Sequence, residues 1–72
     1  MSKVAEKIVE FLRQKKEATI KEIVENINSS YTYTYLEIMF KLIPQGKVDR
    51  VWKDGKFVYF LRGEKNENTS SQ

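Results

Sequence analysis

Residues 29–62 read SSYTYTYLEIMFKLIPQGKVDRVWKDGKFVYFLR, and this stretch decides the fold. Its first half predicts an amphipathic helix from Tyr31 to Ile43, with one of the two preceding serines as the N-cap. The Pro-Gln-Gly that follows ends this helix, because Pro cannot continue a helix and Gly tolerates the left-handed turn beyond its end. We expect the inner face of the helix to contain Tyr31, Tyr35, Ile38 or Met39, Leu42 and Ile43.

The second half of the stretch predicts a β-hairpin. Asp54-Gly55 separates two runs rich in β-branched and aromatic residues, and a type I′ turn needs positive φ at both central positions. The two-residue loop pairs Lys53 with Lys56, Trp52 with Phe57, Arg50 with Tyr59 and Val48 with Leu61. Because the face with Trp52 and Phe57 is the more aromatic one, we expect it to pack against the core, with Trp52 included.

Two further helices precede this stretch. The first is expected from Lys3 to Lys15 with Ser2 as its N-cap, and the second begins at Thr19, where Thr19-Ile20-Lys21-Glu22 fits a capping box. Ala18-Thr19 allows a brief extended segment between them. Apolar residues at helical spacing form their buried faces: Val4, Ile8, Phe11 and Leu12 in the first helix, and Ile20, Ile23, Val24 and Ile27 in the second.

Composition excludes several functional classes. The chain has 72 residues and contains no Cys and no His, which excludes disulfide scaffolds, thiolate zinc sites and the commonest general base and metal ligand. Every Ser lies in an expected helix cap or in the tail, and no nucleophile–base pair is recognisable. We therefore expect neither an enzyme nor a cofactor. The abundance of Lys and Glu is also compatible with a thermophilic origin.

The length predicts one domain over residues 1–62, and the polar residues 63–72 are expected to be disordered. No apolar run approaches the length of a membrane span, so we expect a soluble, cytoplasmic protein. The net charge is +3, and most of this excess of positive charge is in residues 47–62, which contain five basic and two acidic residues. A basic hairpin suits a polyanion, although charged ends also protect an exposed hairpin from aggregation.

The order helix, short helix, turn, helix and hairpin over residues 3–62 resembles the winged helix-turn-helix fold. Thr19 to Ile23 resembles the start of the first helix of the helix-turn-helix, and Met39, Leu42 and Gly46-Lys47-Val48 resemble the approach to the wing. Residues 57–61 resemble the closing wing strand of arsenical-resistance-type repressors. The expected fold is therefore α+β: three helices followed by a two-stranded β-hairpin wing.

The resemblance implies a double-stranded DNA-binding protein of the transcriptional-regulator type. Helix 31–43 would enter the major groove, and the wing would lie on the backbone. The positions that correspond to DNA contacts in the family are Ser29, Ser30, Thr32, Tyr33 and Glu37 in and before that helix, and Lys53 and Lys56 at the wing tip. Arg50, expected to reach the edge of the hairpin, could also meet a phosphate.

The expected contact helix departs from the family, because it contains no Arg, Asn or Gln to read base edges. Tyr33, Leu36 and Phe40 also form a second apolar stripe, which suits a winged-helix module for protein–protein assembly as the alternative function. A body of about sixty residues is marginal alone, so we expect a homodimer. If the helix faces DNA, the dimer surface lies around Ala5 and Val9, with Leu36 and Phe40 packed inward.

Overall fold

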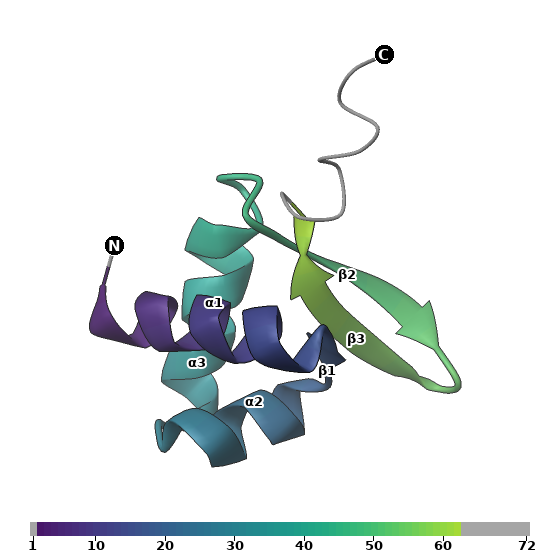
Figure 1. Cartoon of the computed structure of the whole chain (residues 1–72), viewed down its shortest axis with the longest axis horizontal. Helices are drawn as coiled ribbons and strands as arrows, with labels where there is room; N and C mark the ends of the chain where they lie inside the picture. Colours follow the sequence, from purple (N-terminus) through teal and green to yellow (C-terminus); the bar gives the residue numbers. More distant parts are fainter. Residues whose placement is uncertain (1, 63–72) are drawn as a thin grey trace.

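A computed structural model describes residues 2–62, which form an α+β fold of three helices and a three-stranded antiparallel sheet (Figure 1). The elements follow the order α1 (Lys3–Lys15), β1 (Glu17–Ala18), α2 (Ile20–Ile27), α3 (Tyr31–Glu37), a π-helical turn η1 (Ile38–Leu42), β2 (Val48–Lys53) and β3 (Lys56–Leu61). The expectation of a disordered tail over 63–72 lies outside the described residues. No helix among residues 2–62 is long and apolar enough to cross a membrane.

The predicted N-caps of all three helices are confirmed. The Ser2 hydroxyl accepts a hydrogen bond from the Ala5 N–H at 3.0 Å, and the Ser30 hydroxyl accepts one from the Tyr33 N–H at 3.0 Å. Thr19 begins α2 with the expected capping box. Each cap satisfies an N–H group that the first turn of a helix leaves without an internal partner, so the short polar residues fix where the helices begin.

The helix predicted from Tyr31 to Ile43 changes its winding part of the way along. After Glu37 the chain forms the π turn η1, which is closed by the Ile43 N–H donating to the Ile38 carbonyl at 2.9 Å. A π turn holds more residues than an α turn, so it shifts the phase of the residues that follow it. Gly46, at φ +78°, then reverses the chain toward β2.

The sheet has three strands rather than the two that we expected. The hairpin register is confirmed for every predicted pair, and both turn residues, Asp54 and Gly55, have positive φ. The third strand is the two-residue β1, which pairs with the free edge of β3 through Glu17 with Phe60 and Ala18 with Tyr59. This strand was missed as a sheet element because two residues cannot show an alternating pattern.

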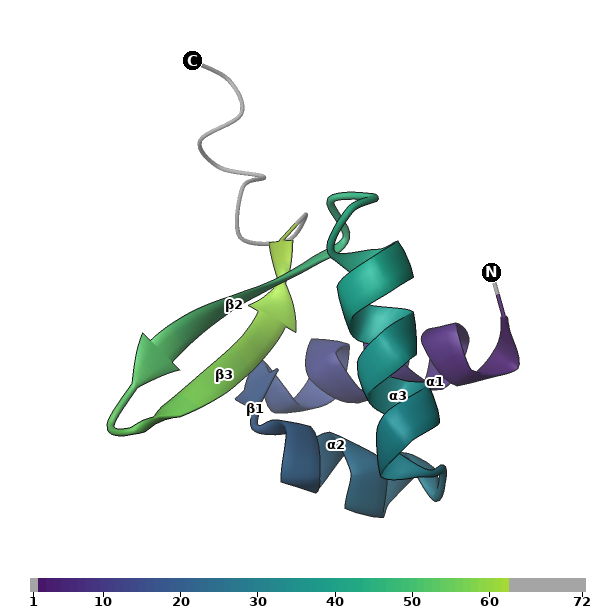
Figure 2. The same ribbon diagram turned by 180° about the vertical axis from the view of Figure 1, so that it is seen from behind.

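The core lies between the three helices and one face of the sheet, and Figure 2 shows α3 crossing in front of α1. Its largest fully buried side chains include Ile8, Leu12, Ile23, Ile38, Leu42, Val48 and Tyr59. The figures also show the tip of the β2–β3 hairpin extending beyond the helices (Figures 1 and 2). The tip is therefore held by the sheet alone, and its side chains remain available for contact.

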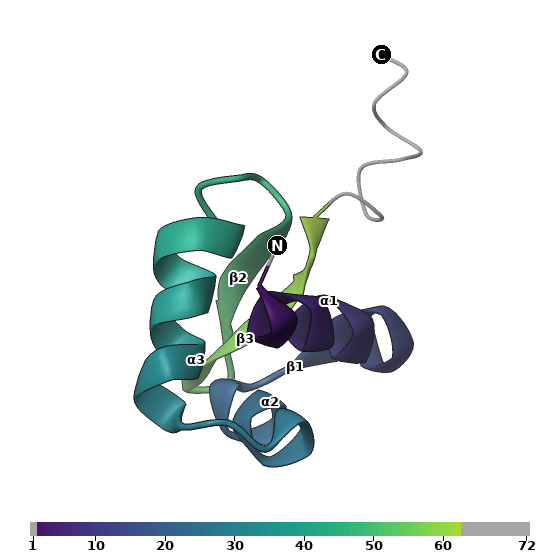
Figure 3. The ribbon, with the colours of Figure 1, turned by 90° about the vertical axis from the view of Figure 1, so that its left-hand side faces the viewer.

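The predicted inner face of the helix over 31–43 is confirmed for Ile38 and Leu42, which are fully buried, and was wrong for the two tyrosines. Thr34 and Glu37 are buried, whereas Tyr31 is 55% exposed and Tyr35 is half-buried. The aromatic and aliphatic residues of this helix form more than one stripe, so their spacing alone could not select the buried one. Thr34 is fully buried although its side chain is polar. Figure 3 shows the start of α3 next to α2.

Candidate nucleic-acid interface

A groove of about 490 Å³ lies between the start of α2, the first turns of α3 and the hairpin. Figure 2 shows the three elements that frame it. Its lining combines three cations with aromatic rings: Lys21, Arg50 and Lys56 on the one hand, and Tyr31, Tyr35, Phe57 and Tyr59 on the other, with Thr19 and Ile20 at the edge. The described residues that line this groove include no carboxylate.

Arg50 is held in this groove by two contacts on the hairpin. Its guanidinium carbon lies 3.8 Å from the centre of the Phe57 ring, and its Nη1 donates a long hydrogen bond to the Tyr59 hydroxyl at 3.5 Å. That hydrogen bond raises the pKa of Arg50 above its ordinary value. An arginine guanidinium is protonated in proteins whatever its surroundings, and stacking on the ring orients it without neutralising its charge.

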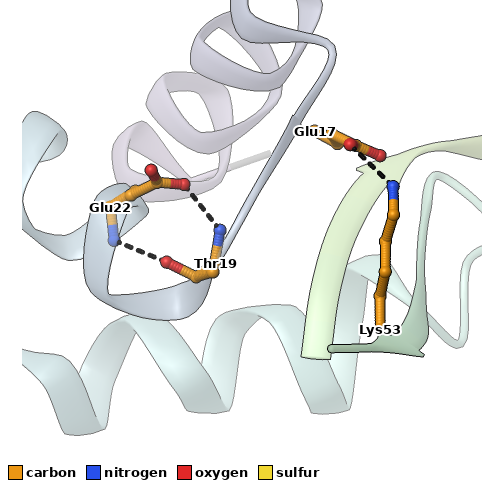
Figure 4. A network of polar contacts seen from close by, with 4 residues as sticks. All are labelled: Glu17, Thr19, Glu22 and Lys53. Atoms are coloured by element: carbon orange, nitrogen blue, oxygen red, sulfur yellow. Dashed lines mark hydrogen bonds and ion pairs between the residues drawn. The ribbon is translucent and has the colours of Figure 1, made fainter. Parts of the chain in front are cut away.

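The two lysines beside the hairpin turn have different surroundings. Lys56 is exposed and lines the groove. Lys53 instead forms an ion pair with Glu17 across the sheet, with its Nζ 3.1 Å from Oε2 (Figure 4). Both members of that pair are about half exposed, so the pair contributes little stability and can open. Of the two predicted wing-tip contacts, Lys56 is the one directed to the groove without an ion-pair partner in the described structure.

The capping box positions the α2 side of the groove. The Thr19 hydroxyl accepts from the Glu22 N–H at 3.3 Å, and the Glu22 carboxylate accepts from the Thr19 N–H at 3.0 Å (Figure 4). The bond from the Thr19 backbone lowers the pKa of Glu22, and the nearby positive charges of Lys15 and Lys56 act in the same direction. Lys21, the second residue of α2, is therefore carried on a helix start with fixed geometry.

The predicted contacts at the start of α3 are only partly free to bind. Thr32 is exposed and Tyr33 is 47% exposed, whereas Ser29 is half-buried. The Ser30 hydroxyl is used by the helix cap. Tyr31 and Tyr35, which the sequence assigned to the core, stack with ring centres 6.3 Å apart and line the groove.

Glu37 does not lie on the exposed side of α3, so its prediction as a contact residue was wrong. It is 2% exposed, and its Oε2 lies 3.1 Å from the Nζ of Lys41. Its other oxygen, Oε1, has no hydrogen-bond partner among residues 2–62. The buried position of this carboxylate follows from the phase of α3, which turns residues 34 and 37 inward together.

The groove differs in charge from two other hollows of the described structure. A hollow between α1 and α2 carries both Lys7 and Glu10, and one beside η1 carries both Lys41 and Glu37. Among residues 2–62 no three carboxylates gather to hold a metal ion. Of these three hollows, the aromatic groove is the one whose charged lining residues all carry the same sign.

Sequence reasoning missed Lys21, Tyr31 and Tyr35 as residues of this surface. The available signal for Lys21 was its position directly after the capped start of α2, where it is exposed. No local pattern identified the two tyrosines, because their exposure depends on how α3 is rotated against the core. No protein-family model matches the chain, and no curated protein matches its sequence. The geometry of the groove is therefore the basis for a functional assignment.

Proposed function

We propose that this chain is a winged helix-turn-helix protein that binds double-stranded DNA, with α3 in the major groove and the hairpin against the phosphate backbone. The observation that carries the proposal is the groove between α2, α3 and the hairpin, where Lys21, Arg50 and Lys56 meet without a carboxylate among the lining residues described. The order of the elements, with β1 paired to the hairpin, is compatible with this fold. A small transcriptional regulator is the role that such a domain would serve.

The chemistry of the groove suits a sugar–phosphate strand. Cations attract phosphate oxygens and release counterions from DNA, and tyrosine hydroxyls donate hydrogen bonds to the same oxygens. Thr32 and Tyr33 supply further hydroxyls at the exposed start of α3. Because α3 and η1 contain no Arg, Asn or Gln, we expect backbone contacts to dominate and sequence discrimination to be modest.

The test is a fluorescence-anisotropy titration of a labelled random duplex at low salt. Lys21→Ala combined with Lys56→Ala should weaken binding by at least about tenfold, and by a similar factor for different duplex sequences. The matched control is Lys3→Ala with Lys7→Ala, which removes the same charge from exposed positions in the first turns of α1. Equal weakening by both pairs of substitutions would show that binding depends on the net charge and not on the groove. No binding by the wild-type chain would refute the proposal.

A second candidate function, a protein–protein assembly module, is favoured by the exposed stripe on α3 and η1. Leu36 is 43% exposed and Phe40 is 70% exposed, so the conditional expectation that both pack inward if the helix faces DNA was wrong. Such a stripe is typical of contact surfaces between proteins. Phe40 lies two turns beyond Thr32, so the start of the helix and its later turns offer separate surfaces.

A further inference from the structure

The hairpin carries an aromatic side chain that duplex backbone contacts do not explain. Trp52 is 62% exposed, although we expected it in the core. It meets Phe57, its partner across the ladder, edge to face with ring centres 4.9 Å apart. The Phe57 ring in turn supports the Arg50 guanidinium at 3.8 Å. Arg50, Phe57 and Trp52 therefore form a cation–aromatic row on one face of the hairpin.

This row continues the basic groove toward the tip of the hairpin. Side chains alternate between the faces of a strand, so Trp52 shares its face with Arg50 and, through the register, with Phe57 and Tyr59. Three of these four residues line the groove itself. An occupant that follows the groove outward would therefore reach Trp52 after passing Arg50, and Lys56 lies one residue pair further out, next to the turn.

The combination of charge and rings defines the occupant by its chemistry. The cations attract a chain of negative charges, and a large exposed ring stacks on a flat apolar surface. A nucleic-acid strand with unpaired bases offers both, because unpaired bases expose the faces that a duplex keeps stacked. Stacking on aromatic side chains also tolerates any base, which agrees with a helix that lacks base-reading side chains.

We propose that Trp52 is a stacking site for an unpaired base, so that the protein prefers DNA with locally unpaired bases over fully paired duplex. This proposal rests on the proposed function, because the groove must first bind the strand. The cations hold the backbone, and Phe57 keeps the indole in place while its exposed part receives the base. The rigid hairpin presents the ring without ordering a loop.

The experiment uses the intrinsic fluorescence of the chain, because Trp52 is its one tryptophan. A duplex with a short central run of unpaired thymines is compared with a fully paired duplex of the same length. Stacking of a base on the indole quenches its emission, so the unpaired duplex should quench Trp52 strongly and the paired duplex weakly. The unpaired duplex should also bind at least about fivefold more tightly.

Variants separate stacking from general binding. Trp52→Ala should remove the fivefold preference and leave the affinity for paired duplex unchanged, whereas Trp52→Phe should keep much of the preference. The matched control is Val51→Ala, which changes a neighbouring residue that is 46% exposed on the opposite face of β2. Because Trp52 is largely exposed, its replacement should not disturb the fold, and circular dichroism checks this directly.

The outcomes distinguish this inference from the proposed function. Tight binding of both duplexes with equal affinity and no quenching would overturn the stacking site and leave duplex binding intact. Binding of neither duplex would overturn both proposals. A Trp52 emission that changes with protein concentration in the absence of DNA would assign the ring to a protein contact and would likewise overturn the inference.

Discussion

At the scale of single residues, the main conflict with ordinary packing is the buried polar pair on α3. Thr34 is fully buried with an unpartnered hydroxyl, and Glu37 is 2% exposed with one unpartnered carboxylate oxygen. Lys41 neutralises the carboxylate from the surface, where its own side chain is 60% exposed. A buried acceptor without a partner costs free energy, so this site next to the π turn lowers the free energy of unfolding.

We therefore expect Glu37→Met to raise the free energy of unfolding by about 1 kcal/mol, because an apolar side chain of similar volume removes the unpaired oxygen. Urea denaturation measures the change. Glu37→Ala is the comparison, since it removes the oxygen but leaves a cavity and should destabilise the protein. A Met variant less stable than the wild type would mean that the carboxylate has a favourable role in the fold.

The residue scale is also where sequence reasoning was weakest. Glu37 was expected to contact DNA because of its position in the family resemblance, and Trp52 was expected in the core because its face of the hairpin is the more aromatic one. Both expectations fail for structural reasons. The rotation of α3 turns Glu37 inward, and Trp52 is 62% exposed near the end of β2, in a hairpin whose tip extends beyond the helices.

At the scale of elements, local signals were sufficient for the starts of the helices and for the hairpin. Caps, the Pro-Gln-Gly break and Asp54-Gly55 act within a few residues, so the starts of the helices and the register of the hairpin could be read directly. The third strand depends on a tertiary contact, because β1 forms by pairing with the edge of β3, and the π turn η1 has no local signal in the sequence. No pattern of residues along the chain contains that information.

The capping box of α2 gives a pH-dependent prediction. Because the folded-state pKa of Glu22 is lowered, its contribution to stability is fully present above the ordinary Glu pKa of about 4.3 and is lost as the pH falls through the lowered value. Glu22→Gln should therefore lose less stability than the wild type between about pH 7 and about pH 3. Urea unfolding at the two pH values measures this.

The control for that experiment is Glu25→Gln, which makes the same charge change on an exposed residue of the same helix. It should follow the wild type more closely than Glu22→Gln does. An identical acid response of all three proteins would show that the capping box does not couple the stability of α2 to protonation.

At the scale of the whole molecule, the predicted dimer surface on α1 needs correction. Ala5 is 2% exposed and belongs to the core, and Val9 packs against that core, so helix one offers no free apolar face at these positions. The exposed apolar stripe is instead Tyr33, Leu36 and Phe40. The two surfaces were equivalent in the sequence, and only the packing of the helices distinguishes them.

We expect the homodimer to form through the part of that stripe that contains Leu36 and Phe40, which leaves Tyr33 at the start of α3 for the proposed DNA contact. Phe40→Glu should dissociate it, because a charge buried at an interface without a partner is strongly unfavourable. Sedimentation equilibrium measures the change in mass at micromolar concentration. Val51→Glu is the control, since it places the same charge on an exposed apolar residue of the sheet. A monomeric wild type would refute the expectation.

The central claim is that the groove between α2, α3 and the hairpin binds the DNA backbone, and the salt dependence of duplex binding tests it most directly. Three phosphate contacts from Lys21, Arg50 and Lys56 predict that the logarithm of the binding constant falls with the logarithm of salt concentration with a slope of about −2.7. Lys21→Ala with Lys56→Ala should make that slope shallower by about 1.8. A slope near zero, or one that the double variant leaves unchanged, would contradict the account.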